Sequence, residues 1–270
     1  MDFGFVWDLD IRVQDFSFGG FVARTFEALM KAEKENQIGP EESRVFDLRP
    51  QAQISIPRNY KLPPRVAEEY HRMKQLILNS SPDRKIKTVL FSSSREGEGT
   101  STVTRDFAIN LASTGDTVLL VDANVRNPVL HNAFNLEKRA GLTELLIGGK
   151  ALAETINKTE IPNLSIITSG VPPSNPSSIF QSKLLDSLLE QMKQQADWVL
   201  FDAPPIHSYN DASTLAGKMD GVIMVLQAES TRWEVAQSAK ERIEQDKVKI
   251  LGTVLNRRKM YIPEWVYRML

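Results

Sequence analysis

The stretch TVLFSSSREGEGTSTVTRDFAINLA, residues 88–112, decides the fold of this chain. Its apolar run Val89–Phe91 is bounded by polar residues, which is typical of a short buried strand. Residues 92–99 are small, polar and glycine-containing, and they indicate a loop. Apolar residues then recur near helical spacing, which predicts a helix over 101–114. Such a loop presents backbone N–H groups at the positive end of a helix, so the stretch predicts a phosphate site.

The loop departs at two positions from the phosphate-loop pattern G-x-x-x-x-G-K-[ST]. Gly99 and Ser101 occupy the positions of the second glycine and of the hydroxyl residue. Ser94 stands where the pattern has its first glycine, and Thr100 stands where it has lysine. The sequence therefore predicts the shape of a phosphate loop without its usual positive charge.

The composition is that of an ordinary globular protein with room for one large α/β domain and appendages. The chain has 270 residues, and its formal net charge of −1 gives no reason to expect nucleic-acid binding. The lack of cysteine excludes disulfides, thiolate metal sites and a cysteine nucleophile. No apolar run approaches the roughly 20 residues that cross a bilayer, and the N-terminal MDFGFVWDLD lacks the basic region of a secretory signal. We expect a cytoplasmic protein that reaches the inner face of the membrane through a partner.

Beyond residue 64 the sequence alternates between apolar runs and amphipathic segments. Runs such as VLLVD and WVLFD are apolar nearly throughout, which is typical of strands buried on both faces of a parallel sheet. We predict strands over 86–92, 117–122, 164–168, 197–202, 220–226 and 249–255. We predict helices over 65–79, 101–114, 140–147, 178–195, 210–217 and 233–246. The expected fold class is α/β, with a mostly parallel twisted sheet flanked by helices and an N-terminal helical arm.

The predicted domain occupies residues 65–256, between an N-terminal arm and linker over 1–64 and a tail over 257–270. The arm contains one amphipathic segment at 21–34. We expect this segment either to pack on the domain as a helix or to dock on another chain. Residues 35–64 are rich in Gln, Pro and charge, and they are interpreted as the linker.

Two predicted strands end in an acid, at the edge of the sheet where ligands bind in this architecture. The strand VLLVD ends in Asp122, and the strand WVLFD ends in Asp202. One aspartate in such a position is more simply a helix cap or a turn residue. Two of them downstream of a glycine loop favour a site for nucleotide and magnesium, because Mg²⁺ takes one or two carboxylates together with phosphate oxygens.

Several motifs follow one another along the chain, namely GEGxST at 97–102, VLLVDxxxRxP at 118–128, DxPP at 202–205 and LGxVLN at 251–256. Their order and spacing resemble the bacterial tyrosine kinases of capsular and exopolysaccharide biosynthesis. The resemblance covers about residues 65–256. It implies a P-loop fold of the deviant-Walker type, related to the chromosome-partitioning and division-site ATPases.

The resemblance implies ATP and Mg²⁺ as ligands. It implies that Ser101, Asp122 and Asp202 hold the metal, and that the two acids act in catalysis together with Arg126. The residues that it assigns to nucleotide binding are Ser94, Arg95, Glu96, Gly97, Glu98, Gly99, Thr100, Ser101, Thr102, Asn256 and Arg257.

The resemblance also implies phosphate acceptors and partners. Tyr261 and Tyr267 in the tail are the candidate acceptors, and a docking segment is an equally good interpretation of this part of the chain. The implied partner is a transmembrane polysaccharide co-polymerase that determines chain length. A homo-oligomer is the other implied assembly, but the helix over 65–79 matches the family's E-x-x-R-x-x-R pattern only in part, so an ordinary amphipathic helix is the alternative.

The chain departs from the family pattern at two residues that phosphoryl transfer needs. Thr100 replaces the lysine that contacts the β- and γ-phosphates, and Asn124 replaces the second acid of the DxD motif. Removing one preorganised charge of this kind typically costs about 10²–10³ in rate. Arg95 is a candidate substitute for the lysine.

Three functions fit these motifs. The first is a protein-tyrosine autokinase with reduced or absent catalysis, which regulates exopolysaccharide polymerisation and export. The second is a pseudokinase scaffold of the export system, and the substitutions at Thr100 and Asn124 favour it on chemical grounds. The third is a partitioning-type ATPase that dimerises on nucleotide, which the DxPP motif disfavours.

Overall fold

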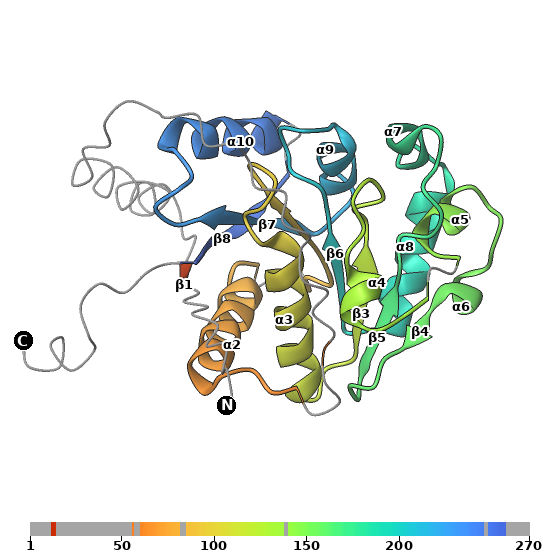
Figure 1. Ribbon diagram of the computed structural model, residues 1–270, viewed down its shortest axis with the longest axis horizontal. Helices are drawn as coiled ribbons and strands as arrows, with labels where there is room; N and C mark the ends of the chain where they lie inside the picture. Colours follow the sequence, from red (N-terminus) through yellow and green to blue (C-terminus); the bar gives the residue numbers. More distant parts are fainter. Residues whose placement is uncertain are drawn as a thin grey trace, which may run out of the picture.

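The computed structural model describes residues 12–14, 56, 60–81, 85–137, 140–245 and 248–257, which form one sheet with helices on both faces (Figure 1). The strands are β1 (Arg12–Gln14), β2 (Thr88–Ser93), β3 (Val118–Asp122), β4 (Asn157–Lys158), β5 (Leu164–Ile167), β6 (Trp198–Asp202), β7 (Gly221–Gln227) and β8 (Ile250–Asn256). In this part of the chain they form an eight-stranded sheet of order β1-β8-β7-β2-β6-β3-β5-β4. The central strands pair in parallel, and the edge strands β1 and β4 run antiparallel to their neighbours. The predicted fold class is thereby confirmed.

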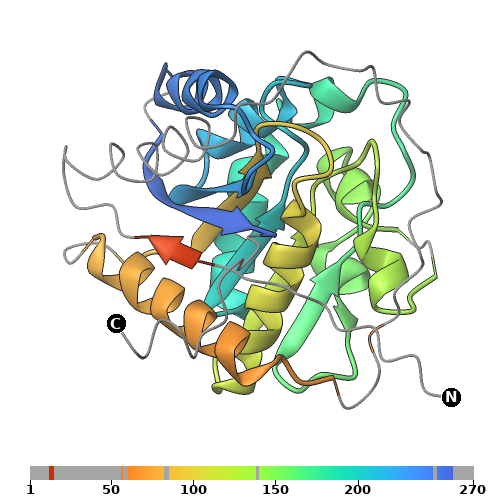
Figure 2. The same ribbon diagram turned by 60° about the vertical axis from the view of Figure 1, so that its left-hand side comes forward.

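The helices divide between the two faces of the sheet. One face carries α2 (Pro64–Asn79), α3 (Thr100–Ser113) and the short α4 (Leu130–Ala133). Figure 2 shows α2 and α3 side by side on this face. The other face carries α5 (Leu142–Leu146), α6 (Leu152–Thr155), α7 (Pro176–Ile179), α8 (Leu184–Gln195), α9 (Asp211–Ala216) and α10 (Trp233–Gln245).

Alternation along the buried strands builds a separate core on each face. In β2, Val89 and Phe91 belong to the core under α2 and α3, whereas Leu90 belongs to the core on the opposite face. Successive side chains of a strand point to opposite faces, so a strand that is apolar throughout must be covered on both. This is why the near-continuous apolar runs of the sequence fold into a sheet between two helical layers.

An aromatic cluster joins the sheet to its helices on the α2 and α3 face. The ring of Phe107 in α3 lies 5.9 Å from that of Tyr70 in α2, 5.8 Å from that of Phe91 and 6.2 Å from that of Trp198. The side chain of Phe107 has no exposed surface. Tilted and edge-on ring pairs of this kind add to the free energy gained by burial. The helix that follows the glycine loop is therefore fixed in place at its centre.

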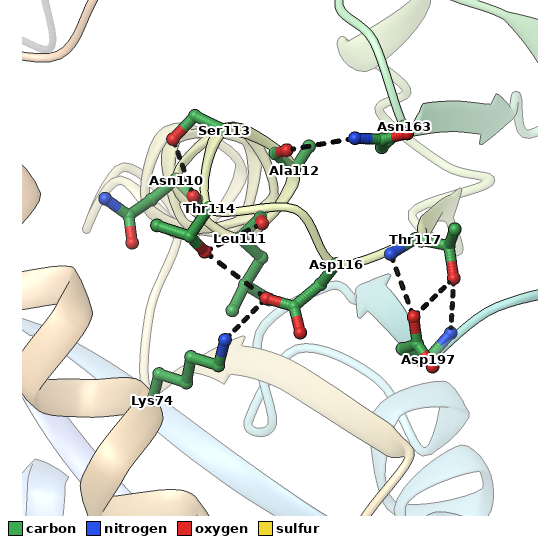
Figure 3. A network of polar contacts seen from close by, with 10 residues as sticks. All are labelled: Lys74, Asn110, Leu111, Ala112, Ser113, Thr114, Asp116, Thr117, Asn163 and Asp197. Atoms are coloured by element: carbon green, nitrogen blue, oxygen red, sulfur yellow. Dashed lines mark hydrogen bonds and ion pairs between the residues drawn. The ribbon is translucent and has the colours of Figure 1, made fainter.

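Polar contacts hold the C-terminal end of α3, the end far from the glycine loop (Figure 3). The ammonium of Lys74 in α2 lies 2.6 Å from a carboxylate oxygen of Asp116, in the turn between α3 and β3. The next residue, Thr117, donates two hydrogen bonds to the carboxylate of Asp197, from its amide at 3.0 Å and from its hydroxyl at 2.6 Å. These bonds join the starts of β3 and β6, so the register of the two strands is set at this end.

The predicted elements differ from the observed ones mainly at their ends, by the one or two residues that are usual for such boundaries. The predicted helix over 178–195 is wrong as one element, since α7 and α8 are separate. The hydroxyl of Ser182 donates to the Leu146 carbonyl at 2.7 Å and accepts from the Leu184 amide at 3.3 Å. A serine that bonds to nearby backbone groups competes with the helix at that point.

Four short elements of the described residues lie outside the predicted ranges. They are β1, β4, α4 and α6, each too short to show a hydrophobic period. The predicted arm helix at 21–34 lies outside the described residues. None of the described helices has the length and apolar character that a membrane span requires.

We expect Phe107→Ala to lower the free energy of unfolding by about 3–5 kcal/mol, because it empties a fully packed ring site. Urea denaturation followed by circular dichroism measures this change. Leu78→Ala is the matched control in α2, since Leu78 is 42% exposed, and we expect it to stay within about 0.5 kcal/mol of the wild type. Equal losses in the two variants would contradict the assignment of Phe107 to the core.

Candidate functional site

The candidate site lies where the carboxyl ends of β2, β3, β6 and β8 meet the start of α3. The loop over 94–99 connects β2 to α3 and turns sharply at two glycines. Gly97 has φ 84° and Gly99 has φ 92°, which is the left-handed region that side chains disfavour. A Cβ on Gly99 would also lie 2.1 Å from the side-chain nitrogen of Asn256. The two glycines of the motif are therefore required by the path of the backbone.

Position 94 needs no glycine. Among the described residues of the loop, positive φ angles occur only at Gly97 and Gly99. The hydroxyl of Ser94 donates to the carboxylate of Glu98 at 2.9 Å, inside the loop. The first departure from the phosphate-loop pattern is thus a serine that contributes to the shape of the loop.

Glu98 holds the base of the loop together. Its side chain is 3% exposed. Its carboxylate accepts hydrogen bonds from the amides of Ser94 at 2.7 Å and Arg95 at 2.9 Å. A further hydrogen bond comes from the hydroxyl of Thr231, which follows β7. Buried carboxylates need such donors in place of water, so Glu98 is a structural part of the loop.

Asn256 supports the loop from β8. Its side-chain nitrogen donates to the Glu98 carbonyl at 2.8 Å, and its side-chain oxygen accepts from the Arg257 amide at 2.9 Å. Asn256 is 1% exposed. Arg257 is exposed, and its guanidinium donates to the side chain of Gln227 at 3.3 Å. The structure therefore places Asn256 against the loop backbone and Arg257 at the surface beside β7.

The helix start is available to bind an anion. Thr100, Ser101 and Thr102 form the first turn of α3, and the first intrahelical bond runs from the Val103 amide to the Gly99 carbonyl at 3.0 Å. The amides before Val103 have no acceptor within the helix, and the helix dipole makes this end positive. Thr100 is 8% exposed at the position of the lysine. The site thus offers backbone donors and hydroxyls where the usual pattern adds an ammonium.

Asp122 and Asp202 lie side by side, because they end two paired parallel strands in register. Neither side chain has exposed surface. One oxygen of Asp122 accepts from the Asn124 amide and the other from the Leu130 amide, each at 3.2 Å. Within the described residues, neither carboxylate oxygen of Asp202 has a hydrogen-bond partner.

Burial governs the protonation of this pair. It raises the pKa of Asp202 to about 7, and the nearby Ser101 hydroxyl, which forms no hydrogen bond of good geometry with it, offsets this in part. Burial and the charge of Asp202 hold the pKa of Asp122 well above its usual range, against the opposing effect of its backbone donors. The pair favours a bound cation because a positive charge would compensate the buried carboxylates.

The donor set around the pair fits Mg²⁺. The carboxylates of Asp122 and Asp202 lie close to the Ser101 hydroxyl at the start of α3. Mg²⁺ prefers oxygen ligands and commonly takes one or two carboxylates, with water and phosphate completing its shell. Among the described residues there is no cluster of three or more His, Cys, Asp or Glu side chains that could hold a metal alone. Any magnesium here would therefore need oxygens from a ligand.

Arg126 is turned toward a different group of residues. Its guanidinium donates to Asp211 at 2.8 Å and to the Ser177 hydroxyl at 3.0 Å. It also lies 3.8 Å from the centre of the Tyr209 ring. These contacts join the loop after β3 to α7 and to the start of α9.

Arg95 is also engaged away from the helix start. Its side chain is exposed, and its guanidinium donates to the Ser230 carbonyl at 2.9 Å. In this arrangement Arg95 does not occupy the position that the missing lysine would have. Glu96 is likewise exposed on the outer side of the loop.

The structure brings together most of the residues that the sequence assigned to the site. The loop over 94–102, Asp122, Asp202 and Asn256 lie at the carboxyl edge of the sheet. The predicted acceptors Tyr261 and Tyr267 lie outside the described residues. Sequence reasoning missed Thr231, which belongs to no motif. It also missed the structural role of Glu98, although a carboxylate between two glycines was an available signal.

We expect Asp202→Asn to stabilise the ligand-free protein more at pH 8 than at pH 5. A carboxyl group whose pKa rises to about 7 on folding stabilises the fold below its unfolded pKa, and this contribution is lost as the pH rises through about 7. Asparagine does not ionise, so it avoids the loss. The gain at pH 8 should reach several degrees in Tm, at roughly 2–4 °C per kcal/mol. Thermal unfolding in the presence of a chelator measures it.

Asp197→Asn is the matched control, because hydrogen bonds from Thr117 lower the pKa of Asp197. A lowered pKa stabilises the fold above the unfolded value near 4, and this contribution is lost only as the pH falls through the folded value. We therefore expect Asp197→Asn to lower the Tm about equally at pH 5 and pH 8. A gain for Asp202→Asn that did not depend on pH would contradict the burial argument.

Comparison with known proteins agrees with this geometry. The family model for an AAA domain matches residues 86–249. Tyrosine-protein kinase YwqD of Bacillus subtilis strain 168 is 35% identical over 194 residues, which cover 72% of this chain and 82% of that protein. The crystal structure of the chimerical protein CapA2B2 superposes with a TM-score of 0.70 at 30% identity, over 74% of this chain and 87% of that one.

A more distant structure shares the fold. It is the septum site-determining protein MinD of Pyrococcus horikoshii OT3, complexed with Mg-ADP, with a TM-score of 0.54 at 20% identity over 62% of this chain and 68% of that one. The similarity to the kinase is greater, since it extends along most of the sequence at 35% identity. From the family match and this identity, the chain belongs to the family of bacterial tyrosine kinases.

Proposed function

We propose that this protein binds magnesium and an adenine nucleotide, and that it regulates exopolysaccharide export with strongly reduced phosphoryl transfer. The observation that carries the proposal is Thr100, the nearly buried first residue of α3, at the position where the pattern has lysine. The surrounding backbone has the shape of a phosphate loop. The site therefore combines the geometry for binding with a deficit of positive charge.

The binding part of the proposal rests on the loop and the acids. The amides over 97–102 would surround the phosphates at the positive end of α3. Ser101, Asp122 and Asp202 would hold Mg²⁺, which when bound would supply positive charge to neutralise the phosphates. The carboxylate oxygens of Asp202 have no hydrogen-bond partner among the described residues, which supports this assignment. The shared fold of MinD in its Mg-ADP complex supports it as well.

The reduced catalysis follows from two residues. A kinase joins the γ-phosphorus of ATP to a tyrosine oxygen while the bond to the departing ADP oxygen breaks, and positive charge must stabilise the moving group. The hydroxyl of Thr100 carries no such charge. The side-chain oxygen of Asn124 accepts a hydrogen bond from the Asn127 amide at 3.1 Å, so this residue shapes a turn where the family has an acid. Each loss is expected to cost about 10²–10³ in rate.

The biological setting is proposed from the family. The protein would act at the inner face of the membrane, bound to a transmembrane co-polymerase. Tyr261 and Tyr267 would be the acceptors of any remaining phosphoryl transfer. In this setting, bound nucleotide would mainly control the conformation of the export partner. Its control of the partner's covalent modification would be the smaller effect.

We expect Thr100→Lys to increase tyrosine phosphorylation at least about 10-fold, because it restores an ammonium to the start of α3. The assay incubates the full chain with Mg-ATP and detects phosphotyrosine by mass spectrometry. Mg-ADP affinity, measured by calorimetry, should be detectable in the wild type and higher in the variant.

Glu190→Gln is the control, because it changes the net charge by the same one unit at an exposed position in α8, away from the loop. We expect it to leave phosphorylation at the level of the wild type. Phosphorylation by the wild type at the level of Thr100→Lys would refute the loss of catalysis. Failure of both proteins to bind Mg-ADP would refute the nucleotide site.

A further inference from the structure

The phosphate loop is bonded to the connection between β7 and α10 at two points. The hydroxyl of Thr231 donates to the Glu98 carboxylate, and the guanidinium of Arg95 donates to the Ser230 carbonyl at 2.9 Å. The two bonds join consecutive residues of the connection to two residues of the loop. Because one of them is buried, the contact is a built interface and not a chance surface encounter.

Thr231 is fully hydrogen-bonded in this position. Its hydroxyl donates its proton to Glu98 and accepts the Gln227 amide at 3.2 Å. The residue is 3% exposed. The hydroxyl therefore relays a hydrogen bond from the end of β7 into the carboxylate that organises the loop.

A second path returns from the connection to the loop through β8. The Ala228 amide donates to the Asn256 carbonyl at 2.9 Å, and the side chain of Asn256 donates to the Glu98 carbonyl at 2.8 Å. Glu98 is thus held by its side chain from one direction and by its backbone from the other. This network of hydrogen bonds fixes the loop against the end of the sheet, so a shift of one bonded residue displaces the others.

We propose that Glu98 and Thr231 are positioning residues that couple the phosphate loop to the start of α10. The connection over 228–232 leads directly into α10, which begins at Trp233. Binding of nucleotide to the loop and the position of α10 would then change together, because both belong to one hydrogen-bonded unit. The effect on nucleotide affinity rests on the proposed function, whereas the effect on the loop itself does not.

The chemistry of the carboxylate sets the size of the effect. Removing the Thr231 hydroxyl leaves Glu98 Oε1 with the Ser94 hydroxyl, at 3.0 Å, as its remaining donor among the described residues. Hydrogen bonds to charged groups are the costly ones to lose. The carboxylate then releases the amides of Ser94 and Arg95 more often. The loop amides beyond them lose their fixed direction, and affinity for phosphate falls.

Thr231→Val in the full chain tests this coupling, with Thr231→Ser as the conservative variant. We expect Thr231→Val to weaken Mg-ADP binding roughly 10-fold, and Thr231→Ser to restore it. Hydrogen exchange of the Ser94 and Arg95 amides, followed by NMR without nucleotide, should be faster in the valine variant only. Thr155→Val is the control, because it removes a buried hydroxyl that bonds the Leu152 carbonyl in α6, and it should change neither readout.

The two readouts separate the coupling from the proposed function. If the wild type binds no Mg-ADP, the nucleotide proposal fails, and amide exchange alone decides whether the coupling exists. If Thr231→Val leaves the exchange of Ser94 and Arg95 unchanged, the coupling is overturned. Should the valine variant not fold, Glu98→Gln serves instead. Its side-chain amide presents a donor to groups that are themselves donors. Unchanged exchange of the Ser94 and Arg95 amides in that variant overturns the coupling equally.

Discussion

Two carboxyl groups lie buried together at the carboxyl ends of two central strands, and the chemistry of the site depends on how their charge is compensated. Asp122 and Asp202 are neighbours because their strands pair in parallel and in register. The backbone amides near Asp122 compensate it in part, whereas Asp202 has no hydrogen-bond partner among the described residues. Without a cation, burial raises the pKa of Asp202 to about 7 and holds the pKa of Asp122 well above its usual range. The helix start beside it supplies only a partial positive charge.

The shape of the loop and its charge come from different residues. Left-handed backbone at Gly97 and Gly99, the carboxylate of Glu98 and the amide of Asn256 define the shape, and all of them are present. The charge normally comes from one lysine, and Thr100 stands in its place. A chain can therefore keep the architecture of a nucleotide site while its catalytic power changes, because the hydrogen bonds that hold the loop among the described residues do not involve the Thr100 side chain.

Much of the fold was predictable because buried parallel strands carry a strong signal. Runs such as WVLFD admit few alternatives, and the acids that follow them fall at the ligand edge by topology. The partners of Arg126 were not predictable, since Asp211 and Ser177 meet it only after α7 and α9 pack together. Thr231 carries no local pattern for the same reason. Sequence reasoning located the loop, but the contacts that brace it connect residues more than a hundred positions apart.

The short strand β1 has a consequence for the whole sheet. It pairs antiparallel with the end of β8, opposite Thr253, Val254 and Leu255. Unpaired strand edges recruit other chains, and β8 would present such an edge without this cover. The strand that carries Asn256 is thus shielded from edge-to-edge association by residues near the beginning of the chain. A proteolytic cut or a competing ligand that removed β1 would turn the same edge into an adhesive surface next to the phosphate loop.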